Sequence, residues 1–247
     1  MLAKVKKTLR AFIEKNQFHP SFAGVLVNPF WLCRRELFSV LQEFSPALTG
    51  NVLDFGCGSG PYRRLLCNAS EYVGLEYDTP ENRVGKRADI FYDGVTIPLS
   101  DGSMNGLLST QTLEHVPNPE RIVEEWNRVL CPGGKLLVTV PFMWPEHEMP
   151  YDFQRYTTNG LRRILEGKGF SVLEQKRLLP DCRAPAQLFL AWLYDILRFG
   201  QRSLKIQIAM SFFVFAPLSL AAAGLAALCP KNPNTYLDNV VLAEKKQ

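Results

Sequence analysis

An aspartate and three glycines stand at alternating positions where a short apolar run ends: Asp54, Gly56, Gly58 and Gly60. A buried strand that ends in a glycine turn is how an open α/β sheet holds a nucleotide-like ligand at the carboxyl end of the strand. Glycine lets the backbone approach such a ligand closely and adopts positive φ angles without steric cost. The dinucleotide fingerprint G-x-G-x-x-G would need a glycine at position 61, which is proline here, so the pattern indicates another ligand.

Two acidic residues follow the glycine turn at positions suited to a nucleotide ligand. Glu76 ends a predicted second strand, residues 71–76, about 20 residues after the glycines, where such folds bind the ribose hydroxyls. Asp89 lies in residues 88–90, which close a predicted short third strand. Each has an alternative: Glu76 as a solvated residue at a strand end, and Asp89 as a structural residue. Residues 61–67, between the turn and the second strand, are compatible with a helix.

The order of the motifs resembles that of class I S-adenosylmethionine (SAM)-dependent methyltransferases. Asp54-x-Gly-x-Gly-x-Gly60 resembles their motif I, and Thr112-Leu-Glu-His-Val-Pro-Asn-Pro119 resembles the segment after their fourth strand. The Pro132-Gly-Gly turn before a predicted fifth strand, residues 135–141, is a further landmark of that family. The resemblance covers about residues 50–180 and implies SAM as the cofactor.

The same resemblance implies a set of cofactor contacts. An acidic residue at the position of Asp89 meets the adenine amino group, and residues 109–111 face the methionine part of SAM. The cofactor-binding residues predicted in this way are Asp54, Gly56, Cys57, Gly58, Gly60, Glu76, Asp89 and Gln111.

The segment after the predicted fifth strand, residues 142–157, concentrates ionisable and aromatic side chains. A loop at the carboxyl end of a parallel strand borders the ligand crevice, so we expect it to bind the methyl acceptor. His147 is the predicted general base for an acceptor hydroxyl, because its ordinary pKa lies near the operating pH. Asp152 would orient His147 or replace it, and Arg155 would bind a carboxylate or phosphate of the acceptor. The alternative is that these three residues form a salt-bridged network that shapes the loop.

Two further observations concern this loop. His115, after the predicted fourth strand at residues 107–111, either supports the loop or acts as a base. The sequence His147-Glu-x-Pro-Tyr-Asp-Phe-x-Arg-Tyr-Thr157 resembles a segment of bacterial methyltransferases associated with cell-surface glycan or lipid-linked sugar pathways.

The predicted elements indicate an α/β fold. The resemblance implies a Rossmann-like seven-stranded sheet, mostly parallel with an antiparallel last strand, with helices on both faces. The last two strands are predicted at residues 170–179 and 236–243. The expected organisation is N-terminal helices at 1–45, a SAM-binding core at 46–180 and 231–247, and an apolar helical insert at 181–230.

Composition excludes several classes of protein. The chain has 247 residues, 47% hydrophobic and 21% charged, which excludes disorder. A net charge of +4 is too small to indicate a nucleic-acid partner. The six cysteines form no C-x-x-C pair and have no metal-ligand spacing, so we expect no metal site and a reducing, cytoplasmic environment.

Two segments suggest contact with a membrane. Residues 206–230 carry no charge and reach the length of a transmembrane helix, about 20 residues. A single crossing would separate the last strand from its sheet, so we expect a hairpin in one leaflet, an apolar lid over the active site, or a dimer-interface helix. Residues 2–15 form a predicted basic amphipathic helix, which either lies on anionic lipid or packs on its own domain. Its apolar face is Leu2, Val5, Leu9, Phe12 and Ile13, and its basic residues are Lys4, Lys6, Lys7, Arg10 and Lys15.

The sequence therefore predicts a SAM-dependent methyltransferase that modifies a small or lipid-linked acceptor, of glycan type or otherwise, at a hydroxyl. We expect it in the cytoplasm, peripheral on the inner face of the membrane, without a nucleic-acid partner. Alternative hypotheses are a quinone or lipid-ring methyltransferase, and a non-catalytic subunit of the same fold that docks a partner through the apolar insert. The oligomeric state is left open.

Overall fold

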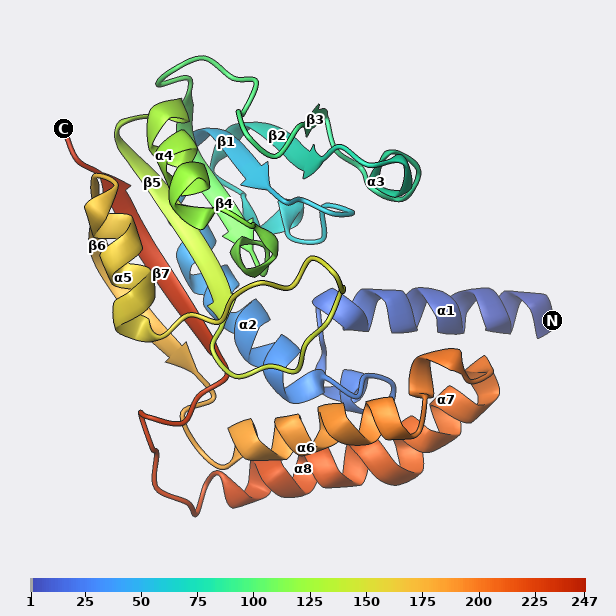
Figure 1. Ribbon diagram of the computed structural model, residues 1–247. Coiled ribbons are helices and arrows are strands. Elements are labelled where there is room, and N and C mark those ends of the chain that lie inside the picture. Colours follow the sequence, from blue (N-terminus) through green and yellow to red (C-terminus); the bar gives the residue numbers. More distant parts are fainter. Residues whose placement is uncertain (1) are drawn as a thin grey trace. The chain divides into compact units, whose positions relative to one another are not determined.

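The computed structural model describes residues 2–247, with side chains described from residue 7 onward, and contains a seven-stranded sheet. The order of the strands across it is β3-β2-β1-β4-β5-β7-β6 (Figure 1). Strands β1 to β5 pair in parallel, whereas β7 is antiparallel to β5. The strands are β1 Gly50–Phe55, β2 Ala69–Tyr77, β3 Ile90–Tyr92, β4 Met104–Thr110, β5 Leu130–Pro141, β6 Phe170–Leu178 and β7 Asp238–Lys245. The predicted α/β sheet with its antiparallel last strand is confirmed.

The chain divides into two compact units. The helical unit is Met1–Val40, Met143–Pro145 and Leu178–Leu237, and the sheet unit is Leu41–Phe142, Glu146–Arg177 and Asp238–Gln247. The predicted boundaries at residues 45, 180 and 231 stay a prediction. Helix α2, Trp31–Phe44, runs from the first unit into the second.

Two amphipathic helices cover one face of the sheet, α4 (Pro119–Val129) and α5 (Thr158–Gly167) (Figure 1). The apolar positions of α4 recur at helical spacing and are fully buried, and Trp126 packs edge-on against Phe55 of β1 at 5.3 Å between ring centres. Thr157 caps α5 by accepting a hydrogen bond from the N–H of Gly160 at 3.1 Å. Both helices agree with the expectation that helices cover the sheet.

The first crossover of the sheet differs from the prediction. Residues 61–67 contain only the short turn η3, Arg63–Leu65, and no α-helix. The glycine turn occupies residues 56–60 and β2 begins at Ala69, so too few residues remain for a stable helical nucleus. The next connection contains the short helix α3, Pro80–Gly85.

The third strand also begins later than predicted. The pairing of β2 with β3 begins at Ile90, so Asp89 precedes the strand. The N–H of Asp89 donates to the carbonyl of Gly74 at 2.8 Å, and its carboxylate accepts the N–H of Gly74 at 2.7 Å.

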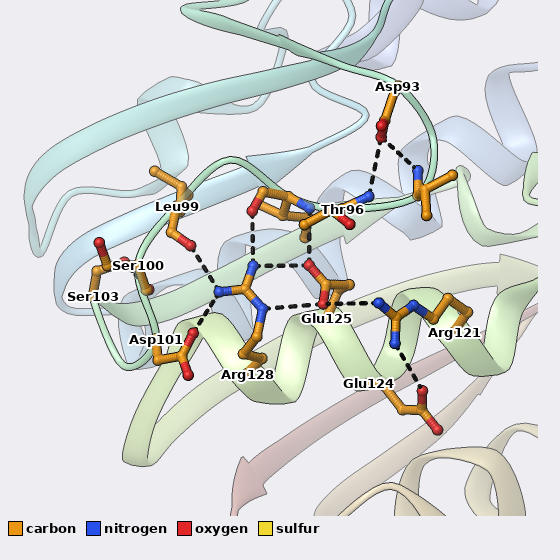
Figure 2. Close-up of polar contacts among 12 residues, drawn as sticks. Asp93, Thr96, Leu99, Ser100, Asp101, Ser103, Arg121, Glu124, Glu125 and Arg128 are labelled. Atoms are coloured by element: carbon orange, nitrogen blue, oxygen red, sulfur yellow. Dashed lines mark hydrogen bonds and ion pairs between the residues drawn. The ribbon is translucent and has the colours of Figure 1, made fainter.

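A buried ion pair fastens the connection between β3 and β4 to α4 (Figure 2). The Arg128 guanidinium donates to Glu125 at 3.0 and 2.8 Å, to the carbonyls of Ile97 and Leu99 at 2.7 and 2.8 Å, and to Asp101 at 2.6 Å. Glu125 Oε2 also accepts the N–H of Ile97 at 2.9 Å. These bonds fix the entry into β4, whose opposite end carries candidate site residues.

Helices form most of the helical unit: α1 (Leu2–Phe18), η1 (Phe22–Leu26), α6 (Arg183–Ile196), η5 (Phe199–Gln201), α7 (Leu204–Met210), η6 (Ser211–Phe215) and α8 (Ala216–Leu225). Helices α6 and α8 lie side by side (Figure 1). The segment Leu204–Leu225 is a continuous 22-residue helix with one π turn, and by length and composition it could cross a membrane. The predicted apolar helical insert between β6 and β7 is confirmed.

Helix α1 has an apolar face and a basic face, as predicted, within the part whose side chains are described. Leu9, Phe12 and Ile13 are half-buried, whereas the basic residues of this stretch, Lys7, Arg10 and Lys15, are exposed. The prediction also includes Leu2, Lys4, Val5 and Lys6, whose side chains lie outside the described part of the structure.

Candidate active site

The glycine turn after β1 and the carboxylate at the end of β2 lie together in the structure. The N–H of Gly58 donates to Glu76 Oε2 at 2.9 Å, and Gly58 has a φ of 57°. Since β1 and β2 are parallel neighbours, their carboxyl ends meet at one edge of the sheet. Glu76 is buried, with 9% exposure, so its proximity to the turn is built into the fold and it is not a solvated strand end.

Asp54 is a buried acid at the base of the turn, and it accepts a hydrogen bond from the Tyr72 hydroxyl at 2.7 Å. Burial raises the pKa of Asp54 to about 7, the Tyr72 hydrogen bond lowers it, and the charge of Glu76 raises it further. Burial and the nearby carboxylates of Asp54, Glu76 and Asp89 raise the pKa of the Cys57 thiol to about 12. Three carboxyl groups therefore surround this turn, and their combined potential favours a cationic ligand.

Two further predicted cofactor residues, Asp89 and Gln111, bond to the backbone and side chains of the sheet. The Asp89 carboxylate accepts the N–H of Gly74 at 2.7 Å, which gives it a structural partner on β2. Gln111 follows β4 with a φ of 50°, and its N–H donates to the carbonyl of Thr139 at 2.9 Å. A positive φ in a non-glycine residue stores strain and often marks a functional position.

The loop after β5 brings together the three predicted catalytic residues. Arg155 donates two hydrogen bonds to the Asp152 carboxylate, at 2.5 and 2.6 Å. The same carboxylate accepts the backbone N–H of His147 at 2.9 Å and lies 3.3 Å from its Nδ1. The Arg155 guanidinium holds the pKa of Asp152 well below its usual range. Asp152 therefore remains ionised, lies beside His147 and is held by Arg155.

A second histidine and a buried acid face this loop from the short turn η4, Leu113–His115. His115 Nδ1 lies 2.7 Å from the Tyr151 carbonyl, and its ring packs edge-on against His147 at 4.8 Å between ring centres. Glu114 is fully buried, and its two carboxylate oxygens have no hydrogen-bond partner in another residue among those that the structure describes. Burial raises the pKa of Glu114 to about 8, and the nearby acids Asp238 and Asp152 add to this.

Comparison with known proteins identifies the central part of this sheet unit. The family model for a methyltransferase domain matches residues 53–138, a range that includes the glycine turn, Glu76, Asp89 and Gln111. Residues 53–138 are therefore similar to a methyltransferase domain.

Relatives of the domain occur among mycobacterial proteins. The chain is 32% identical over 139 residues to an uncharacterized methyltransferase of Mycobacterium sp. (strain JLS), which covers 54% of this chain and 55% of that protein. It is 32% identical over 164 residues to a probable S-adenosylmethionine-dependent methyltransferase of Mycolicibacterium smegmatis. This alignment covers 60% of this chain and 62% of that protein. The chain thus spans little more than half the length of these relatives.

The fold has counterparts among solved structures. An S-adenosylmethionine-dependent methyltransferase from Mesorhizobium loti has a TM-score of 0.53 at 16% identity, over 85% of this chain and 98% of that one. At this identity the likeness shows the fold alone.

The cofactor of the methyltransferase domain is S-adenosylmethionine, and the residues at the turn fit it. Asp54 and Glu76 are acidic groups at the turn, which suits the positive charge of SAM, and the N–H of Gly58 holds Glu76 in place. Gly58 leaves room at the turn, since a Cβ there would meet only Lys86 Nζ, at 3.9 Å. The acceptor residues His147, Asp152 and Arg155 lie outside the matched range, so their roles remain predictions.

Sequence reasoning missed two residues of this region. The sequence pattern places Tyr72 in a strand and indicates no site role for it, although its hydroxyl donates a hydrogen bond to Asp54. Glu114 stood inside a family-like run without a role of its own, although an acid next to a histidine just after a strand is a signal that could have identified it.

Proposed function

We propose that the protein is a SAM-dependent methyltransferase that methylates a hydroxyl of a small or lipid-linked acceptor. The observation that carries this proposal is the His147–Asp152 pair on the loop after β5, next to the strand whose end holds Gln111. Asp152 keeps the His147 Nδ1 proton directed toward itself, which leaves Nε2 as the proton acceptor. When bound, SAM supplies an electrophilic methyl group on a sulfonium, so the protein has mainly to position the acceptor and remove its proton.

We expect each of these loop residues to contribute to removal of the acceptor proton. His147 Nε2 takes the proton of the acceptor hydroxyl, and the buried, ionised Asp152 stabilises the imidazolium that forms. Arg155 holds Asp152 in place through its paired hydrogen bonds. The edge-on ring of His115 limits the positions of the His147 ring.

We also propose that the helical unit contacts the cytoplasmic face of a membrane and that the acceptor comes from there. Many large apolar side chains of the insert between β6 and β7 are exposed. They are Phe189, Trp192, Ile196, Ile206, Phe212, Phe213, Leu218, Leu220, Leu225 and Leu228. Basic residues flank them in sequence at Arg198, Arg202, Lys205 and Lys231, as anionic lipid would favour. The resemblance of residues 147–157 to enzymes of cell-surface glycan and lipid-linked sugar pathways supports the same acceptor class.

The enzymatic proposal is tested with radiolabelled SAM. The purified protein is incubated with methyl-labelled SAM and with organic and aqueous extracts of cells that lack it. We expect label in the organic extract, and loss of labelling in Glu76→Ala and His147→Ala. Glu76→Ala should weaken SAM binding by about tenfold or more, the value of a charged hydrogen bond of about 1.5–3 kcal/mol. If SAM binds but no extract is labelled, the protein is a non-catalytic subunit.

The membrane proposal is tested by co-sedimentation with anionic liposomes. Phe212 and Phe213 are 51% and 74% exposed, so replacing both by serine removes apolar contact without opening a core. We expect this double variant to sediment less than wild type, whereas Val84→Ser, at a 90% exposed position of α3, sediments as wild type does. Equal sedimentation of all three proteins, or none by wild type, would contradict the proposal.

A further inference from the structure

We propose that Glu114, His115 and His147 bind one divalent transition-metal ion of the zinc type. Each residue offers one ligand atom, and these atoms all lie within 4.8 Å of one another. Glu114 and His115 come from η4 after β4, and His147 comes from the loop after β5. The fold therefore assembles the three ligands from two segments, and no spacing in the sequence indicates them.

The two imidazole rings are held in the orientation that metal ligation requires. His115 Nδ1 lies 2.7 Å from the carbonyl of Tyr151, and His147 Nδ1 lies 3.3 Å from the carboxylate of Asp152. An acceptor beside Nδ1 fixes the proton there and leaves the Nε2 lone pair for a metal, which is the usual arrangement around metal-binding histidines. The His115 Nε2 does face the carboxylate of Glu114, at 3.9 Å from Oε1.

The burial of Glu114 is an independent observation in favour of a bound metal ion. Its side chain is fully buried, and neither carboxylate oxygen has a hydrogen-bond partner in another described residue. A buried carboxyl group without a hydrogen-bond partner is costly to ionise, and a coordinated metal ion would offset that cost. Arg155 acts on Glu114 electrostatically and donates hydrogen bonds to Asp152 and to the carbonyl of Gln154.

The donor set selects the class of ion. Two imidazole nitrogens and one carboxylate suit zinc, iron(II) or cobalt(II), whereas magnesium and calcium prefer oxygen ligands. Three protein ligands leave a position open for water or for an oxygen of the acceptor, as in catalytic zinc sites. Partial exposure of the side chains of His115 and His147, 16% and 33%, gives an ion access to the site.

The role of the ion rests on the proposed function, whereas its binding does not. An ion at this position would lower the pKa of a coordinated hydroxyl and so supply the activation that His147 gives in the ion-free site. His147 Nε2 would then be a ligand and no longer a proton acceptor.

The experiment is a titration of untagged, metal-free protein with Co²⁺, read by visible absorption and by equilibrium dialysis. Cobalt on nitrogen and oxygen ligands gives visible bands without the near-ultraviolet charge transfer that thiolates produce, so the six cysteines are distinguished from this site. The variants are Glu114→Gln, His115→Gln and His147→Gln. The control is His19→Gln, because His19 is the third histidine of the chain and packs on Phe38.

We expect one cobalt ion per chain, without thiolate bands, and at least a tenfold loss of affinity in each ligand variant but not in His19→Gln. If Glu114→Gln does not fold, the test rests on His147→Gln, whose side chain is partly exposed on a loop. Absence of stoichiometric binding, or unchanged binding in the ligand variants, would overturn the proposal. SAM binding by calorimetry on the same samples is independent of this result, so failure of the metal site and failure of the proposed function are distinguishable.

Discussion

Asp54 makes SAM binding by this protein dependent on pH. Its carboxyl group is buried at the base of the glycine turn and has its pKa raised to about 7, because burial and the charge of Glu76 outweigh the hydrogen bond from Tyr72. Only the ionised carboxylate attracts the positive charges of SAM. A bound cation lowers the pKa of Asp54, so binding releases a proton when the pH is below about 7 and the affinity falls as the pH falls.

The size of the effect follows from that pKa. With a pKa of about 7, roughly one Asp54 in ten is ionised at pH 6 and about nine in ten at pH 8. If SAM binds only the ionised form, its apparent affinity drops by about tenfold between pH 8 and pH 6. In Asp54→Asn this dependence should be absent, and the affinity at pH 8 should be lower than that of wild type. S-adenosylhomocysteine lacks the sulfonium charge, so its affinity should change less with pH.

The assay is isothermal calorimetry at pH 6, 7 and 8 with wild type and Asp54→Asn. The variant isolates the contribution of Asp54, because it changes this group alone. A thermal melt provides a reading without ligand. The folded-state pKa of Asp54 lies above its unfolded value of 3.8, so wild type loses stability as the pH rises from about 4 to about 7, and Asp54→Asn should lose less. Equal pH profiles of the two proteins in both assays would refute the reasoning.

Three further predictions follow from individual contacts. Tyr72→Phe removes the hydrogen bond that lowers the pKa of Asp54, so the midpoint of the SAM-binding pH profile should move upward in calorimetry. Arg128→Ala leaves the buried Glu125 carboxylate without its main partner, so it should lower the unfolding free energy by about 3–5 kcal/mol in urea denaturation. The control is Arg162→Ala, which removes the exposed Arg162–Glu166 pair and should cost under about 1 kcal/mol. Thr157→Ala removes the cap of α5 and should cost about 1 kcal/mol in the same assay, unlike Thr157→Ser.

The sequence was sufficient for the parts of the fold that local patterns determine. Apolar runs and their order placed the strands, and the helical spacing around Trp126 placed α4 with its buried face. The antiparallel last strand was predicted from the family resemblance, and its pairing with β5 confirms it. The helix expected at residues 61–67 was wrong, because helix-compatible residue types do not reveal that the turn before them leaves too little chain.

The site was predictable only as a set of candidates. The clustering of ionisable residues at 146–157 indicated a functional loop, and the structure shows that His147, Asp152 and Arg155 do meet. Their relation to Glu114 depends on the adjacency of β4 and β5 in the sheet, and the sequence carries no local signal for which carboxylate ends up unpaired. Sequence therefore identified the groups, and the tertiary contacts show which of them lie together.

One contact connects the SAM turn to the candidate metal ligands. Gly56 has a φ of 71°, and a Cβ at this position would lie 2.3 Å from Thr112 Cγ2 and 2.4 Å from its Oγ1. Thr112 stands next to Gln111 and two residues before Glu114, so displacing it moves the segment that carries both. Gly56→Ala should therefore weaken SAM binding and cobalt binding together, each by about tenfold or more.

Gly133→Ala is the matched control for that change. Gly133 has a comparable φ of 76°, but a Cβ there meets nothing within 4 Å, so the substitution adds backbone strain without a clash. A residue forced into this backbone region costs about 1–2 kcal/mol, so both variants should lose stability in urea denaturation. Only Gly56→Ala should lose ligand affinity, measured by calorimetry with SAM and by cobalt absorption. If Gly56→Ala lost SAM affinity while binding cobalt as wild type does, the contact through Thr112 would not couple the two sites.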